Sequence, residues 1–299
     1  MTDWWNHLVD FQNYGQLLGL VHNSLIAGAV LGLVGGLAGV VVAQRDLPFA
    51  VHGISELSFA GASVALLVGA DVAAGSVVGS VLAAALIGVL GVRARERSSI
   101  IGVLMPFGLG LGVLALSLYQ GRAANKFGLL TGQIVAVDST RLGVLLSISA
   151  VVVVGLLVLW RPLVFSGVDP EVAEARGVPT RALSLAFMLL LGLAVALAVQ
   201  VVGALLVLSL LVTPAAAAAR VTASPLRMTL LSITFAVVSA VGGILLALGA
   251  SVPISPYITT ISFTIYVVCR VVGARRLRRG ADRRPAGSGR PLEPVAQGV

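Results

Sequence analysis

Residues 48–69 read PFAVHGISELSFAGASVALLVG, an almost uninterrupted apolar run. A bilayer core about 30 Å thick is crossed by roughly 20 apolar residues in a helix. Eight further runs of similar length occur at about 17–42, 72–91, 100–119, 141–160, 182–200, 202–219, 228–249 and 255–273. The pattern predicts an all-α, polytopic membrane protein with eight or nine transmembrane helices. The lower number applies if 182–219 is one run and not two runs separated at Gln200.

The composition supports the same class. Hydrophobic residues make up 58% of the chain and charged residues 11%, and the mean hydropathy is +1.04, whereas soluble domains carry about 25% charged residues. Cys269 is the only cysteine, which excludes an intrachain disulfide and a thiolate cluster. Glycines recur four residues apart at 28, 32 and 36 and at 75 and 79, a spacing that favours close helix packing in lipid.

The basic residues are distributed unevenly along the chain. Alternating the nine runs places only Arg122, Lys126 and Arg141 on one side and nearly all other Arg residues on the opposite side. The Arg-rich side, which includes the C-terminus, is expected to be cytoplasmic. The expected organisation is an extracytoplasmic segment 1–16, a transmembrane domain 17–273 and a basic, disordered cytoplasmic tail 274–299. Because most of the net charge of +8 flanks the membrane, it does not indicate a nucleic-acid partner.

Two ionisable residues lie inside the run 48–69. His52 and Glu56 are one helical turn apart and therefore share one helix face. An ionisable residue within a membrane span indicates a functional site, and imidazole with carboxylate is a ligand pair for a divalent transition metal. Glu56 follows Asp46 by ten residues, roughly 15 Å along a helix, which places it near the middle of the bilayer. Alternatively, His52 is a polar core residue that bonds a neighbouring carbonyl.

Two further polar residues, His22 and Asn23, lie near the outer end of the first run. They either assist an ion at the entrance or form ordinary hydrogen bonds between helices.

Catalytic motifs are missing from the sequence. It contains no GxxxxGK[ST] loop, no HExxH and no Gly-x-Ser-x-Gly elbow, so it predicts neither an ATPase nor a hydrolase. The chain is not expected to be an enzyme.

Two cytoplasmic loops carry signals for short helices. In the first, Asp169 is a helix N-cap, Pro170 and Glu171 begin the helix, and Gly177 ends it. In the second, Pro214 interrupts the run 202–219 and the residues from Ala215 through Ala217 to Arg220 form a short helix. Both are expected to dock a soluble partner.

Four segments together resemble the integral membrane permease subunits of the manganese/zinc/iron ABC transporter family, over about residues 20–272. They are RDLPFAVHGISELSFAGASVALLVG (45–69), NKFGLLTGQIVAVDSTRL (125–142), FSGVDPEVAEARGV (165–178) and VGALLVLSLLVTPAAAAARV (202–221). The family's motif has Asp and then His one turn apart; this sequence has His52 and then Glu56. One imidazole and one carboxylate are kept in exchanged order.

The resemblance implies the permease of an ATP-driven metal importer in a bacterial plasma membrane, with a cobalamin-permease-like helix bundle. A separate cytoplasmic ATPase would dock on the loops that carry Asp169, Glu171, Gly177, Pro214, Ala217 and Arg220. An extracytoplasmic binding protein would deliver Zn²⁺, Mn²⁺ or Fe²⁺, and a second permease subunit would complete the pathway. No cofactor is bound permanently; the divalent ion is the substrate. The alternatives are a permease for a chelate (haem, siderophore or cobalamin) and a secondary, ion-coupled metal transporter.

Overall fold

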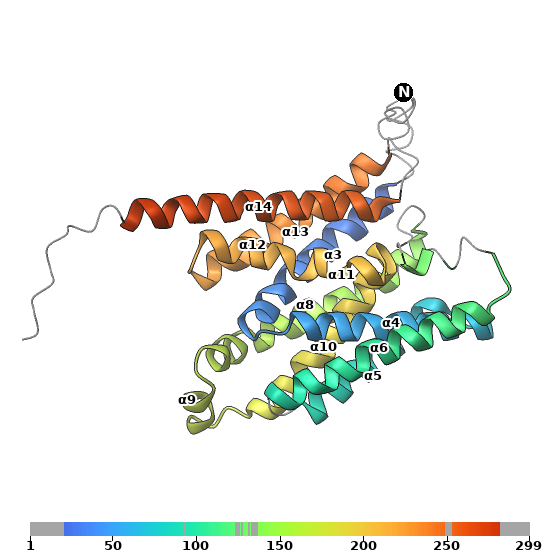
Figure 1. Cartoon of the computed structure of the whole chain (residues 1–299), viewed down its shortest axis with the longest axis horizontal. Coiled ribbons are helices and arrows are strands. Elements are labelled where there is room, and N and C mark those ends of the chain that lie inside the picture. The colour runs from blue at the N-terminus through green and yellow to red at the C-terminus, as the bar shows by residue number, and fades with distance from the viewer. Residues whose placement is uncertain are drawn as a thin grey trace, which may run out of the picture.

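The computed structural model describes residues 21–91, 94–122, 126, 128–130, 132, 137–248 and 253–281. All regular structure in these residues is helical (Figure 1), which confirms the predicted fold class. The elements are α3 His22–Gln44, α4 Pro48–Val68, α5 Val72–Leu90, α6 Ala94–Leu118, α8 Ser139–Val168, α9 Pro170–Ala175, α10 Thr180–Val202, η2 Ala204–Leu206, α11 Val207–Leu211, α12 Thr213–Val221, α13 Pro225–Leu248 and α14 Ile254–Ala281.

Eight of these helices, all but α9, η2, α11 and α12, are long and apolar enough to cross a membrane. The predicted segment 1–16 lies outside the described residues. Residues 274–281, which the sequence assigned to a disordered tail, continue helix α14, and the rest of that tail lies outside the description.

The predicted span 202–219 is not one helix. Gly203, at φ 86°, ends α10, and the chain continues as η2, α11 and α12. Gly203 adopts this left-handed conformation readily, and a side chain there would collide with the carbonyl of Leu130. Pro214 then lacks the backbone N–H that would join α11 and α12 into one regular helix. The run 202–219 is thus divided into short helices, with Pro214 at a break as the sequence predicted, and the eight long helices agree with the predicted eight or nine.

The broken segment nevertheless extends from one end of the bundle to the other. Near its start, the Ser255 hydroxyl at the beginning of α14 donates to Val202 O (2.8 Å). Near its end, Gly273 in the last part of α14 lies against the backbone of Arg220. Within the described residues the chain thus traverses the bundle nine times, eight times as a long helix and once in short pieces. Accordingly, α3 begins and α14 ends at opposite ends of the bundle (Figure 1).

Helices α3, α4 and α10 form the buried centre of the bundle. Glycines permit their close contacts, as the four-residue spacing predicts. A methyl group on Gly32 would lie 2.6 Å from Val237 Cα on α13, and the Ser232 hydroxyl of α13 donates to Gly36 O at 2.8 Å. Helix α4 packs against α5, α6 and α10, and its position follows from these contacts.

Candidate functional site

Helix α4 carries the two ionisable residues that the sequence singles out. Pro48 occupies its first turn, where the missing N–H has no cost. Gly69 ends it at φ 73°, with its N–H directed at Leu66 O and Ala65 O. Glu56 is eight residues beyond Pro48, or about 12 Å along the axis. The pair therefore lies in the first half of the 21-residue helix.

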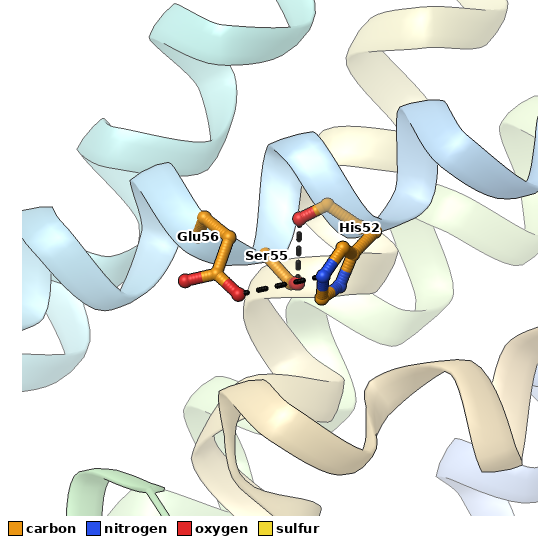
Figure 2. Close-up of polar contacts among 3 residues, drawn as sticks. All are labelled: His52, Ser55 and Glu56. Atoms are coloured by element: carbon orange, nitrogen blue, oxygen red, sulfur yellow. Dashed lines mark hydrogen bonds and ion pairs between the residues drawn. The ribbon is translucent and has the colours of Figure 1, made fainter. Parts of the chain in front are cut away.

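His52 and Glu56 face each other across one turn of α4. Figure 2 shows their side chains projecting from adjacent turns, with His52 Nε2 3.7 Å from Glu56 Oε1. The Glu56 side chain is 5% exposed and that of His52 29%. The hydroxyl of Ser55, between them, donates to the His52 carbonyl at 2.8 Å and is thus occupied by the backbone.

Each member of the pair keeps one polar atom without a hydrogen-bond partner among the described residues. These atoms are His52 Nδ1 and Glu56 Oε2, and both are buried. Buried polar atoms are normally paired, and an unpaired one calls for an explanation such as an absent ion or water. The alternative was that His52 bonds a nearby carbonyl. In the described part of the chain, the buried Nδ1 of His52 makes no such bond.

The walls around the pair come from neighbouring helices. Gly108 of α6 lies against the backbone at Glu56, where a methyl group would be 3.0 Å from Glu56 C. Helix α4 also contacts η2 and α11 of the broken segment. No cluster of three or more His, Cys, Asp or Glu occurs among the residues that the structure describes. An ion held by this pair would therefore take two ligands from the side chains of His52 and Glu56 and would need others.

Arg45 fixes the start of α4. The sequence indicated no role for it beyond its contribution to the Arg-rich side of the membrane. It precedes Asp46, whose φ of 54° makes the tight turn between α3 and α4. Arg45 Nη2 donates to Ser166 Oγ (2.6 Å) and to Leu163 O (3.3 Å). Its guanidinium carbon lies 5.9 Å from the centre of the Phe187 ring. Burial, and secondarily the charge of Arg97, lowers the pKa of Arg45.

His22 and Asn23 lie far from the His52–Glu56 pair. They begin α3, and the pair lies beyond the other end of that helix, in the first half of α4. His22 is exposed. Asn23 Nδ2 donates to Val137 O at 3.2 Å, which links α3 to the segment before α8. The structure does not bring these two residues together with His52 and Glu56, and their role at an entrance stays a prediction.

The first predicted docking helix forms as the sequence indicates. Asp169 Oδ1 accepts from Val172 N at 3.0 Å and caps α9, and Glu171 lies in its first turn. Gly177, at φ 81°, ends it, with N–H bonds from Gly177 to Glu174 O and from Val178 to Ala173 O, the arrangement of a Schellman motif. Asp169 and Glu171 are exposed.

The second docking helix, α12, spans Thr213–Val221 and has Pro214 in its first turn. Ala217 is fully buried against this chain, because α12 packs on α13 and α14. Its exposed residues are Ala219 and Arg220. The prediction that Ala217 meets a partner therefore requires correction: the accessible surface of this helix is its last turn. Both α9 and this last turn lie at the end of the bundle where α14 finishes (Figure 1).

Nine traverses of an apolar bundle, an ionisable pair within one of its central helices and short helices at one end define a multi-pass membrane transport protein. The chain belongs to the ABC 3 transport family, whose pattern it matches over residues 18–273.

Similar proteins and structures agree with this assignment. The manganese transport system membrane protein MntC of Halalkalibacterium halodurans is 30% identical over 83% of this chain and 85% of its own length. The high-affinity zinc uptake system membrane protein ZnuB of Haemophilus influenzae is 26% identical over 82% of this chain and 94% of its own. PsaBC from Streptococcus pneumoniae, solved with a Fab, superposes with a TM-score of 0.79 at 25% identity, over 90% of this chain and 99% of that one.

An inward-facing ABC transporter described as of metal-chelate type aligns over 94% of both chains with a TM-score of 0.67. Its identity is 17%, so this likeness concerns the fold alone.

Proposed function

We propose that this chain is the permease subunit of an ATP-driven importer of divalent transition metal ions and forms the translocation pathway. The observation that carries the proposal is the His52–Glu56 pair, a half-buried imidazole and a buried carboxylate in the first half of a central helix, in a protein of the ABC 3 transport family. Relatives named for manganese and zinc transport support Mn²⁺ and Zn²⁺ as the first substrates to examine.

The distance within the pair suits one shared ion. Two donors that bind a metal at about 2.1 Å with a tetrahedral angle lie about 3.4 Å apart. The observed 3.7 Å between His52 Nε2 and Glu56 Oε1 approaches this value, and a small side-chain rotation would close the difference. Two ligands form an incomplete shell, which suits a passing ion better than a stored one. Water, backbone carbonyls or a second permease subunit would supply the remaining ligands.

The order of the ligands bears on the choice of metal. A hard carboxylate at position 56 and an imidazole at position 52 keep the ligand types of the family's Asp–His motif, in exchanged positions. Ligand types alone rank divalent metals poorly, so part of the selectivity would reside in an extracytoplasmic binding protein.

The Arg-rich end of the bundle would face the cytoplasm. The described basic residues Arg45, Arg97, Arg176, Arg220 and Arg227 lie at that end, where loops and helix termini meet. A positive bias of this kind marks the cytoplasmic side. A separate ATPase would then dock on the exposed surface of α9, around Asp169 and Glu171, and on the last turn of α12.

Uptake of radiolabelled Mn²⁺ or Zn²⁺ into vesicles, with the ATPase reconstituted, tests the proposal. His52→Ala and Glu56→Gln should each abolish uptake while the amount of inserted protein stays unchanged. Ser147→Ala is the matched control, since this exposed hydroxyl bonds only Val144 O of its own helix. Wild-type rates in both site variants would contradict the assignment of the site.

The double variant His52→Asp with Glu56→His restores the family's ligand order. It should recover uptake that either single change removes, with an altered preference between Mn²⁺ and Zn²⁺.

Blocking ATP hydrolysis separates this proposal from a secondary transporter, because uptake that persists without hydrolysis would require an ion gradient as the driving force. A permease for a bulky chelate would still transport that chelate at the wild-type rate in the His52→Ala and Glu56→Gln variants.

A further inference from the structure

A groove opens between α13 and α14 at the Arg-rich end of the bundle. Its volume is about 380 Å³. Leu231 and Phe235 of α13 line one wall and Val268 and Val272 of α14 the other, while Arg227 lies at the mouth. The lining is mainly apolar, with Thr222 and Arg227 as its polar members.

The length of the groove along α13 matches the upper part of a lipid chain. From Arg227 to Phe235 is eight residues along α13, or about 12 Å. One leaflet of the hydrocarbon core is about 15 Å thick. A lipid whose headgroup contacts Arg227 would therefore place the first part of one acyl chain between the two helices.

Arg227 is the charged residue in the lining of the groove. Arg220 and Arg270 approach Tyr266 on the neighbouring surface, with Arg270 Nη1 3.4 Å from the Tyr266 hydroxyl. The sequence has no Asp or Glu from residue 175 to residue 281. No carboxylate of α12, α13 or α14 is therefore available to neutralise these guanidinium groups, and guanidinium binds phosphate oxygens in two-point contacts.

We propose that this groove binds one anionic phospholipid, with its phosphate on Arg227 and one acyl chain between Leu231 and Phe235 on one side and Val268 and Val272 on the other. The lipid would brace the turn between α12 and α13. Zwitterionic lipid fits the same groove, but its headgroup has no net charge to offset the charge of Arg227.

Native mass spectrometry of the full-length protein, titrated with phosphatidylglycerol or phosphatidylcholine, tests the proposal. The wild type should bind one phosphatidylglycerol in preference to phosphatidylcholine. Arg227→Gln should weaken phosphatidylglycerol binding about tenfold, as expected for one charge-assisted contact, and remove the preference. Arg181→Gln is the control, because Arg181 is exposed in the first turn of α10 and does not line the groove.

A second variant tests the groove itself. Leu231→Trp fills the space between the helices and should reduce binding of both lipids, although every Arg remains. Equal phosphatidylglycerol affinity in Arg227→Gln and Arg181→Gln would overturn the proposal. Unchanged binding in Leu231→Trp would also overturn it, because the lipid would then be held by surface charge without the groove.

Discussion

The substitution Gly61→Ala tests how closely α4 and α5 pack. A methyl group at Gly61 would collide with the carbonyl oxygen of Gly75 and lie 3.0 Å from Gly79 Cα, and both contacts are to backbone of α5. Side chains can rotate away from an added methyl group, whereas a helix backbone cannot. The substitution therefore has to displace a helix.

The size of the effect follows from these contacts. Carbon atoms attract best at about 3.5–4.0 Å, and the collision with Gly75 O is closer than the contact with Gly79 Cα, so α5 must move away by roughly 1 Å. Overpacking of this kind costs about 1–3 kcal/mol. The better helix propensity of Ala returns about 1 kcal/mol. We expect a net loss of stability of about 0–2 kcal/mol, the difference between these two terms.

Thermal unfolding of the purified protein in one detergent measures this loss. Gly110→Ala in α6 is the matched control, since nothing lies within 4 Å of a methyl group there and only the gain in propensity remains. Gly61→Ala should melt below the wild type and Gly110→Ala at or above it. If both variants were equally stable, the backbones of α4 and α5 would not be in contact and this account of the bundle would be wrong.

Two further predictions concern charged residues outside the spans. Arg45→Gln loses the charge-assisted bonds to the end of α8 and should destabilise the protein by about 2 kcal/mol. The control is Arg161→Gln at an exposed position, which should change the stability by less than about 0.5 kcal/mol. Equal melting temperatures of the two variants would contradict the role of Arg45. Hydrogen bonds from the backbone N–H groups of Arg141 and Thr140 lower the pKa of Asp138, so its stabilising contribution is complete at neutral pH and is lost as the pH falls through that lowered pKa. Melting curves at decreasing pH should show a smaller decline for Asp138→Asn, which caps the helix without titrating.

Local patterns predicted much of this structure. Hydropathy located the eight long helices, because each must be apolar over its full length. The i, i+4 spacing placed His52 and Glu56 on one face of a helix. The Asp169–Pro170 start and the Gly177 end of α9 follow from capping preferences that act within a few residues.

Other features depend on contacts that no local pattern contains. The partners of Arg45 lie up to 121 residues away in the chain. The run 202–219 is equally apolar whether continuous or broken, so hydropathy cannot distinguish the two forms. The Ala-rich helix α12 has small side chains on every face, and nothing in its sequence indicates that Ala217 faces inward.

The broken segment also determines when this protein completes its fold during synthesis. A carbonyl at a helix break requires a donor, because the hydrocarbon core offers no water. Two hydroxyls of α14, those of Ser255 and Ser262, supply donors to Val202 O and Ser209 O, and each of these residues follows its acceptor by 53 positions. The segment between α10 and α13 therefore leaves the ribosome long before its hydrogen-bond partners exist. It reaches its final structure only when the last helix has inserted, and a nascent chain arrested before α14 should keep this segment accessible to protease.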